Sequence, residues 1–238
     1  MDSKKTGIGQ LILLTGAIIG FLVGSGVATG QEILQYYTPY GLWTIGTAIV
    51  IASILIIANY GFAYAGHRGN FSKGSEVFSY YCGPKFGMIF DWFSVIFCYL
   101  SFIVMVGGGA STLHQQFGAP AILGALFVVI LAGTTVAFGL NSVVNIVSKI
   151  GILKVVLVLS VCFIALMMTS GSLPTNMARV QNQEIEMIKA ADNWFLSGVS
   201  NGGFCILWLA GYVATLSTKV DYRTLLKANV LSSVILVI

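Results

Sequence analysis

The chain has 238 residues, of which 57% are hydrophobic and only 8% are charged, and its formal net charge is +4. Soluble domains carry about 25% charged residues, so this composition excludes an ordinary water-soluble domain. The basic residues form no patch with interleaved aromatic residues, so we expect no nucleic-acid partner. The composition instead predicts an all-α polytopic membrane protein that has the lipid bilayer as its surroundings.

Long uncharged runs define the predicted membrane spans. Five such runs exceed the roughly 20 residues that a helix needs to cross a bilayer, and the third is long enough for two crossings. The predicted spans are 8–37, 42–65, 86–112, 121–138, 147–168 and 194–216, followed by a seventh that begins near Leu225. We interpret residues 1–238 as a single transmembrane domain that is truncated at its C-terminal end, because the chain stops at Ile238 inside an apolar run.

The basic residues predict the orientation of the chain in a bilayer. One side of the predicted membrane receives Lys4, Lys5, Arg68, Lys73, Lys85, Lys149, Lys219, Arg223 and Lys227, whereas the opposite side receives Arg179 and Lys189. Basic residues are concentrated in cytoplasmic loops. We therefore expect a multi-pass protein of the plasma (inner) membrane with a cytoplasmic N-terminus, and the long polar segment 169–192 then faces outward.

The first span contains the sequence Gly24-Ser25-Gly26-Val27-Ala28-Thr29-Gly30-Gln31-Glu32, with three glycines in seven residues. Each glycine costs about 1 kcal/mol of helix propensity relative to alanine. Backbone groups that are freed at membrane depth are tolerated only inside protein or beside a polar cavity. We therefore predict that this helix unwinds to build a binding site. The other interpretation is a small-residue packing face of the GxxxG kind, and both interpretations stay open at the level of sequence.

The sixth span contains a similar cluster, Ser197-Gly198-Val199-Ser200-Asn201-Gly202-Gly203, and we predict a second break there. The first and sixth spans are an odd number of crossings apart, so they traverse the membrane in opposite directions. Two broken helices in inverted orientation are typical of transporters built from inverted repeats, with the substrate site between half-helix ends at the membrane midplane. Free N–H groups at such ends suit a carboxylate, and free carbonyl groups suit a cation or an ammonium group.

A family resemblance rests on the string Val23-Gly24-Ser25-Gly26-Val27-Ala28-Thr29-Gly30-Gln31-Glu32-Ile33, with Tyr36, Tyr37 and Gly41 after it. This string is similar to the YkvI-type bacterial membrane proteins, and its Gly-Ser-Gly start resembles the glycine-rich first span of the amino acid–polyamine–organocation superfamily. The resemblance implies the LeuT-type fold, a 5+5 inverted repeat with helices 1 and 6 broken. The first repeat would cover about 6–169, the outer loop about 169–192 and the start of a truncated second repeat about 193–238, so that about seven of the ten helices are visible.

The candidate site consists of the two predicted breaks and three charged or aromatic side chains. The substrate-binding candidates are Gly24, Ser25, Gly26, Val27, Ala28, Thr29, Ser197, Gly198, Ser200 and Asn201, although interhelical hydrogen bonding is the other interpretation of the polar ones. Glu32 is interpreted as a gate or as a partner for an amine or a proton, or else as a solvated interfacial residue. The resemblance implies that Lys154 lies against the first break where other relatives hold Na⁺, and that Tyr99 is an aromatic gate. The alternative for Lys154 is a side chain that reaches the cytoplasmic interface.

These features predict a secondary active transporter that moves a small zwitterionic solute, an amino acid in chemical class, by alternating access. The resemblance implies coupling to H⁺ or Na⁺, with Lys154 favouring H⁺, and we expect no covalently bound cofactor and no metal site. The alternative is a non-transporting membrane receptor that binds a small ligand in the same pocket. We expect no enzyme activity, because the sequence has no HExxH motif, no pair of intramembrane aspartates and no Ser/His arrangement. The oligomeric state stays open.

Overall fold

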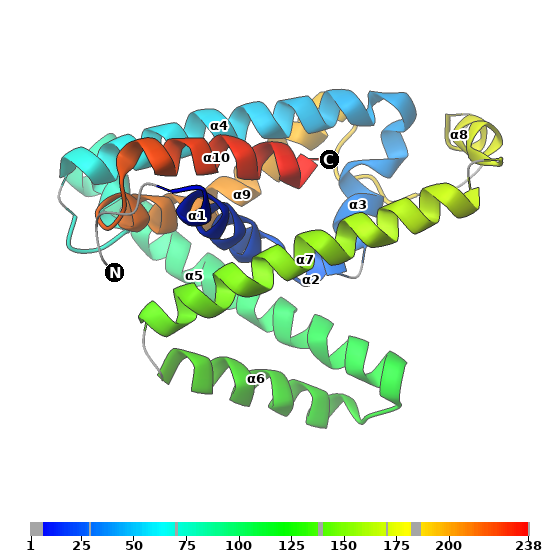
Figure 1. Ribbon diagram of the computed structural model, residues 1–238, viewed down its shortest axis with the longest axis horizontal. Coiled ribbons are helices and arrows are strands. Elements are labelled where there is room, and N and C mark those ends of the chain that lie inside the picture. The colour runs from blue at the N-terminus through cyan, green and yellow to red at the C-terminus, as the bar shows by residue number, and fades with distance from the viewer. Residues whose placement is uncertain are drawn as a thin grey trace.

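The computed structural model describes residues 7–28, 30–69, 71–137, 140–169, 171–181 and 187–237. The secondary structure within these ranges consists of helices and contains no strand, which confirms the predicted all-α class. The elements in chain order are α1 (Ile8–Leu22), α2 (Ser25–Ala28), α3 (Gln31–Tyr36), the 3₁₀ turn η1 (Thr38–Trp43), α4 (Thr44–Gly69), α5 (Glu76–Phe117), α6 (Ala121–Ala137), α7 (Leu140–Thr169), α8 (Leu173–Gln181), α9 (Trp194–Ser217) and α10 (Tyr222–Val237), as Figure 1 shows.

Helices of the described chain match the predicted spans in position. Those that are both long and apolar enough to cross a bilayer lie within Thr38–Gly69, Glu76–Phe117, Ile150–Thr169 and Trp194–Ser217. The helices α1 and α6 are apolar but shorter, and α2 and α3 extend the first span beyond its break. The helix α10 has 16 residues, which is too short to count among the helices that could cross a bilayer. The chain is a polytopic helical membrane protein.

The third predicted span starts at a bend in α5 rather than at the first residue of that helix. Gly83 has a φ of 74° and a ψ of 170°, which a side chain at this position would disfavour, and Pro84 follows it. Proline suits the first turn of a helix because it lacks the N–H group that would be unpaired there. A short arm, residues 76–82, therefore precedes the long part of α5.

The helices α4 and α9 pack closely along their whole length. Their glycine contacts pair Gly46 with Trp194, Val50 with Gly198, Ile54 with Gly202 and Gly66 with Ala214. The residue numbers rise together on both helices, so the two helices run parallel. Parallel packing is what the alternation of crossings requires of a second and a sixth span.

The predicted break in the sixth span is wrong, because α9 is one continuous helix from Trp194 to Ser217. Its glycines serve close packing instead. A Cβ atom added to Gly198 or to Gly202 would press on side chains of α4. Small residues spaced four apart let helix backbones approach closely in membranes, and these two glycines are such a pair. The described structure therefore contains one broken span rather than two.

Two further helices close the bundle around α1. The helix α10 runs antiparallel to α4, and the His67 ring near the end of α4 stacks on Tyr222 at the start of α10 with 4.9 Å between ring centroids. The helix α7 crosses α1 where Gly20 meets Gly151, and a Cβ atom on either glycine would collide with the backbone of the other helix. This close crossing brings the middle of α7 against the end of α1.

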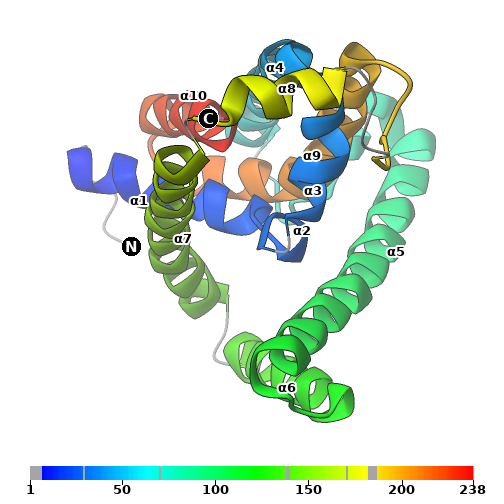
Figure 2. The same cartoon turned by 90° about the vertical axis from the view of Figure 1, so that its right-hand side faces the viewer.

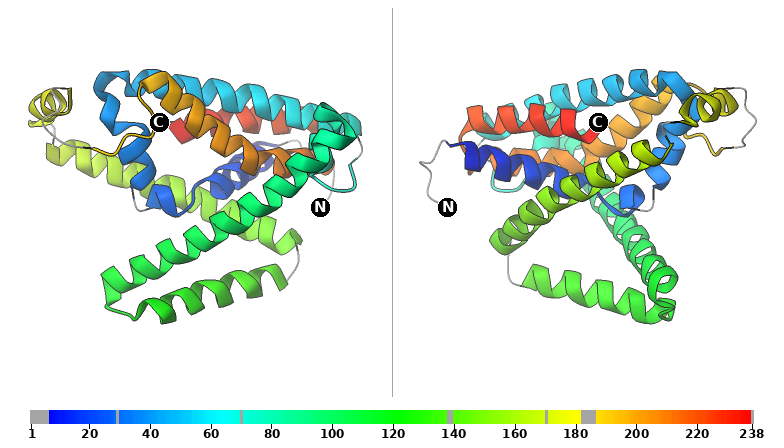
Figure 3. Two further views of the ribbon diagram at one scale, coloured as in Figure 1. Left: turned by 180° about the vertical axis from the view of Figure 1, so that it is seen from behind. Right: turned by 45° about the vertical axis from the view of Figure 1, so that its right-hand side comes forward.

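The helices α5 and α6 form a hairpin that leans away from the rest of the bundle, as Figures 2 and 3 show. Many of its outward side chains are large and apolar; Trp92 is 66% exposed and Ile130 is 62% exposed. Lipid tails cover such a surface without the cost of exposing it to water. The hairpin therefore has the surface expected of membrane-spanning helices.

Candidate functional site

The first span breaks where its glycine cluster predicts. The helix α1 ends at Leu22, Val23 is extended with a φ of −72° and a ψ of 95°, and helical structure resumes in α2. A second interruption follows at Gly30, whose φ of 75° lies in the left-handed region that glycine adopts without strain. The predicted break of the first span is therefore confirmed.

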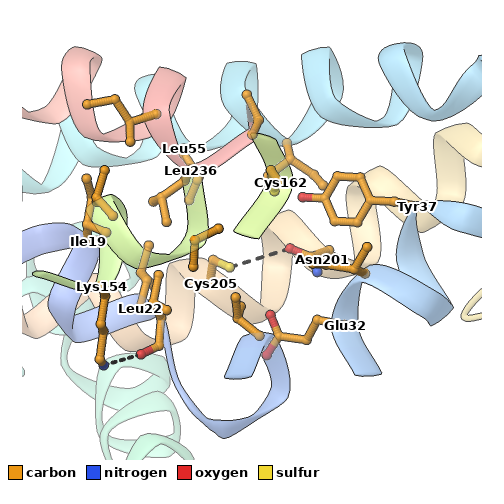
Figure 4. A pocket seen from close by; sticks show the side chains of 18 of the residues that line it. Ile19, Leu22, Glu32, Tyr37, Leu55, Lys154, Cys162, Asn201, Cys205 and Leu236 are labelled. Atoms are coloured by element: carbon orange, nitrogen blue, oxygen red, sulfur yellow. Dashed lines mark hydrogen bonds between the residues drawn. The ribbon is translucent and has the colours of Figure 1, made fainter. Parts of the chain in front are cut away.

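Lys154 of α7 donates to carbonyl groups at the end of α1. Its Nζ lies 2.5 Å from the carbonyl oxygen of Val23 and 3.5 Å from that of Gly20, and Figure 4 shows the side chain reaching this end of α1. In an uninterrupted helix these two oxygens would accept from the N–H groups of residues 24 and 27. The lysine thus takes the place of helical hydrogen bonds at the break.

The outer part of the first span is capped by side chains from two neighbouring helices. The Ser197 hydroxyl of α9 donates to the Tyr36 carbonyl at 2.8 Å, and the Thr44 hydroxyl of α4 donates to the Tyr37 carbonyl at 2.7 Å. The last carbonyl groups of a helix have no partner within that helix, so these contacts satisfy groups that would otherwise be unpaired. They fix α3 against α4 and α9.

A cavity of about 320 Å³, which we name the α7 cavity, lies between the broken span and helices α4, α7, α9 and α10. Ligand pockets range from about 300 to 1,000 Å³ and combine apolar walls with a few polar groups. Most of the residues around the α7 cavity are aliphatic, and its polar or thiol-bearing residues are Glu32, Tyr37, Thr44, Lys154, Cys162, Asn201 and Cys205. This volume and lining suit a small solute.

A second cavity of about 570 Å³, which we name the α5 cavity, lies between the broken span, α5 and α9. Gly24, Gly26, Gln31 and Gln35 line it from the broken span, and Ser101 and Gly108 line it from α5. Leu22, Glu32 and Asn201 line both cavities. Glu32 and Asn201 therefore form part of the partition between the two cavities.

The polar groups of this partition have specific neighbours. A Cβ atom at Gly26 would collide with the Glu32 carboxylate, so the glycine leaves the space that the carboxylate occupies. Asn201 is 5% exposed, and its Oδ1 accepts from the Cys205 thiol at 3.6 Å. A carboxylate and a buried amide on a shared wall can bind the polar end of a ligand on either side.

Aromatic rings from α1, α5 and α9 form one cluster beside the α5 cavity. Phe21 stacks on Tyr212 with 4.3 Å between centroids and meets the edge of Trp208 at 6.0 Å. Phe97 contacts Trp208 at 5.4 Å and Phe204 at 5.3 Å. Aromatic pairs add about 0.5–1.5 kcal/mol beyond their buried area, so this cluster stabilises one wall of the cavity.

Two predicted site residues lie away from the cavities. Tyr99 is 64% exposed and is not among the described residues that line either cavity. Phe97 lines the α5 cavity instead, because a shift of two residues turns a helical side chain by about 200°. Ser200 is likewise exposed on α9 and lines neither cavity, whereas Asn201 faces inward.

The remaining candidates are divided among several environments. Gly24 and Gly26 line the α5 cavity and Val27 lines the α7 cavity, whereas Gly198 is buried against α4. Ser197 lies at the end of α3 through its hydrogen bond. The side chains of Ser25 and Ala28, and all of Thr29, lie outside the described residues.

Sequence reasoning missed several residues that line the cavities. Cys205 is not among the predicted site residues, yet it lies four residues after Asn201 on the same face of α9 and contacts it. The i, i+4 spacing on one helix face was the available signal. Tyr37 and Cys162 also line the α7 cavity, and nothing in their local sequence marks them as cavity residues.

Comparisons with known proteins place the chain beside two bacterial proteins. A stretch of 145 residues is 32% identical to the "Uncharacterized protein YyaD" of Bacillus subtilis (strain 168), and a stretch of 147 residues is 24% identical to the "Uncharacterized membrane protein YkvI" of the same organism. Each match covers 59% of this chain, but only 40% and 42% of the two relatives. The chain therefore spans about two-fifths of the length of these curated relatives.

No family model matches the chain, and no solved structure matches it. The similarity to YkvI agrees with the apolar helices in identifying a membrane protein. Membership in the amino acid–polyamine–organocation superfamily stays a prediction from the resemblance of the first span.

Proposed function

We propose that this chain belongs to a secondary transporter that carries a small zwitterionic solute, such as an amino acid, by alternating access. The observation that carries the proposal is the break in the first span, which adjoins two cavities and is held by Lys154. Lipid cannot satisfy the backbone groups that such a break exposes, so it persists only beside protein or a cavity. A discontinuous helix at the substrate site is the arrangement that many secondary transporters use.

The charges around the α7 cavity support a zwitterionic solute. Glu32 and Lys154 both line this cavity, and Figure 4 shows them at separate sides of it. The Glu32 carboxylate suits an ammonium group, and Asn201 beside it offers both a donor and an acceptor. The aliphatic remainder of the wall favours a solute with a short apolar body over one with many hydroxyl groups.

The contacts of Lys154 favour H⁺ as the coupling ion. A protonated lysine has three donors and a full positive charge, and this one faces the carbonyl oxygens of Gly20 and Val23. Loss of the proton removes the charge that these oxygens attract, which weakens the hold of α7 on the break. Proton binding and release at Lys154 would then couple to movement of the broken span.

The test is uptake of labelled amino acids by liposomes that contain the complete gene product, under an imposed pH gradient or an imposed Na⁺ gradient. We expect uptake to follow the pH gradient and to fall to background in Lys154→Ala. The matched control is Lys219→Ala, because Lys219 is exposed in the loop between α9 and α10 and should leave uptake unchanged.

The other outcomes separate the remaining possibilities. Uptake that follows Na⁺ and survives Lys154→Ala keeps the transporter but removes the lysine from ion coupling. Binding of an amino acid without uptake or counterflow would overturn transport and support a receptor. Neither uptake nor binding of any candidate solute would reject the proposed substrate class.

A further inference from the structure

A set of buried polar side chains lies outside both cavities, on α1, α4 and α10. Thr15 is 5% exposed, Asn59 is 1% exposed and Asn229 is 2% exposed. Within the described part of the chain, the Thr15 hydroxyl and both side-chain atoms of each asparagine have no hydrogen-bond partner. Each unpaired buried donor or acceptor costs about 1–3 kcal/mol, so five such atoms need an explanation.

The two asparagines lie at the same level of the antiparallel pair α4–α10. Asn59 is 8 residues before His67 and Asn229 is 7 residues after Tyr222, and those two rings stack on each other. At a rise of about 1.5 Å per residue, both asparagines lie about 10–12 Å from the stacked rings. Both are buried, so their side chains lie within the packed interior at this level.

Thr15 of α1 belongs to the same layer. Three residues that line the α7 cavity, Ile19, Leu55 and Leu236, come from α1, α4 and α10. On the side of the His67–Tyr222 stack, Thr15 and Asn59 lie one helical turn from Ile19 and Leu55, and Asn229 lies two turns from Leu236. We name the side chains of Thr15, Asn59 and Asn229 the polar layer, which borders the floor of the α7 cavity.

The chemistry of the unpaired atoms selects the ligand. The layer presents three oxygen atoms, and also the Nδ2 donors of both asparagines. A metal cation could satisfy the oxygens but would leave the amide donors unpaired and would meet no carboxylate, because α1, α4 and α10 contain none. Water both donates and accepts, and buried waters typically make about three hydrogen bonds to otherwise unsatisfied groups.

We propose that the polar layer binds a cluster of internal water molecules directly below the α7 cavity. This water site does not depend on the proposed transport function, since the argument for it rests on burial and hydrogen bonding alone. The cluster extends the polar lining of the cavity by one to two helical turns toward the end of the bundle where α4 meets α10. It gives water a place inside an otherwise aliphatic core.

The test is hydroxyl-radical footprinting of the complete protein in detergent, in which radicals formed from bound water oxidise neighbouring side chains. Leu55 and Leu225 lie one turn from the two asparagines, and both are buried, with 1% and 0% exposure. The internal control is Val77, which is 1% exposed but packs in a separate core cluster with Ala65, Ala210 and Ala214. We expect oxidation of both leucines well above that of Val77, and Leu225 is the deciding residue because Leu55 also lines the α7 cavity.

Two variants and one matched control complete the design. In Asn59→Leu/Asn229→Leu we expect oxidation of Leu225, which lines neither cavity, to fall to the level of Val77, and in the milder Thr15→Val, which keeps the side-chain shape, to fall part of the way. Ser160→Ala is the control, because the Ser160 hydroxyl is exposed and donates within its own helix to Val156. A thermal unfolding transition shows that each variant is folded.

Wild-type leucines that are oxidised no more than Val77 would overturn the proposal and point to direct contacts between the asparagines. Oxidation that is unchanged in both variants would overturn it as well. An unfolding temperature that rises with NaCl in wild type, but not in the variants, would overturn the proposal and indicate that the polar layer binds a cation.

Discussion

Glu32 lines both cavities, and its carboxylate packs against Gly26 in the partition between them. Hydrogen bonds to charged groups contribute about 1.5–3 kcal/mol, and about 1.4 kcal/mol is a factor of ten in affinity. Replacing Glu32 by glutamine removes the charge and keeps the shape. We therefore predict that Glu32→Gln raises the half-saturation concentration for an amino acid about 10- to 100-fold, as measured by uptake or by direct binding.

The matched control for this change is Glu76→Gln. Glu76 begins α5 and accepts from the Ser72 hydroxyl at 2.6 Å and from the Lys73 N–H at 3.1 Å. It is not among the described residues that line the cavities, so its substitution should leave the half-saturation concentration unchanged. Equal effects of the two substitutions would show that Glu32 is a solvated interfacial residue with no role in recognition.

Asp221 controls a second local property, the pH dependence of the start of α10. The N–H and the hydroxyl of Thr224 both donate to its carboxylate at 2.9 Å, and the backbone bond, followed by the hydroxyl bond, holds the pKa of Asp221 below its ordinary value of 3.8. Since the folded state has the lower pKa, this contribution to stability is fully present above the ordinary value. It is lost as the pH falls through the lowered pKa.

We predict that Asp221→Ala lowers the stability at pH 7 by about 1 kcal/mol, the usual effect of losing a helix cap. The difference between wild type and Asp221→Ala should shrink as the pH falls below 3.8. Asp221→Asn still accepts a hydrogen bond but cannot titrate. The stability difference between Asp221→Asn and Asp221→Ala should therefore not shrink at low pH. The measurement is thermal unfolding in detergent over a pH series, and a difference that is constant with pH would contradict the assignment of the cap.

At the scale of elements, the glycines of α9 decide how closely it packs on α4. A Cβ atom at Gly198 would lie 2.9 Å from the Val50 side chain and 3.1 Å from the Thr47 carbonyl oxygen, whereas one at Gly203 would meet nothing within 4 Å. We predict that Gly198→Ala destabilises the fold by about 1–3 kcal/mol through overpacking. Gly203→Ala should instead be neutral or stabilise by about 0.5–1 kcal/mol through helix propensity.

Denaturant unfolding of the two variants in mixed micelles measures this difference directly. The two substitutions have the same chemistry on the same helix, so propensity cancels and the contact with α4 remains. If Gly198→Ala proved as stable as Gly203→Ala, α4 and α9 would have room to separate, and close packing would not be the reason for the cluster.

Both glycine clusters look alike in sequence, yet only the first one interrupts a helix. The span positions follow from hydropathy, which acts locally, and they could be predicted. The clusters could not be told apart in this way, because a small residue permits both an unwound backbone and a close helix contact. The difference is tertiary: Gly198 meets α4, whereas the carbonyls at Gly20 and Val23 meet the ammonium group of Lys154.

The same limit explains which site residues were predicted. Glu32, Lys154 and Asn201 are conspicuous because polar residues in apolar helices are costly and need partners, and all three line the α7 cavity. Whether a side chain points into a cavity depends instead on how its helix is rotated about its own axis. An aromatic residue of α5 was expected at the site. Apolar residues occur on every face of that helix, so its sequence could not distinguish Tyr99 from Phe97.

At the scale of the whole molecule, the two ends of the bundle differ in charge. The ends of α4 and α9 and the starts of α5 and α10 meet at one end, through the His67–Tyr222 stack and the contact of Gly74 with Gly211. The basic residues of this end are Arg68, Lys73, Lys219, Arg223 and Lys227. At the other end, the Tyr40 hydroxyl donates to the Ala191 carbonyl at 2.6 Å, and the charged residues of segment 187–192 are Lys189 and Asp192, whose charges cancel.

This asymmetry predicts the orientation of the protein, because basic residues favour cytoplasmic loops. With the four native cysteines replaced by alanine, a single cysteine at Lys219 should react with a membrane-impermeant maleimide in inside-out vesicles and not in intact cells. A single cysteine at Ile188, which is 77% exposed in the segment before α9, should react in intact cells. The reverse pattern would place the basic end outside and contradict a cytoplasmic N-terminus. Reaction of both positions from the same side would contradict the α9 crossing itself, since only that helix separates them.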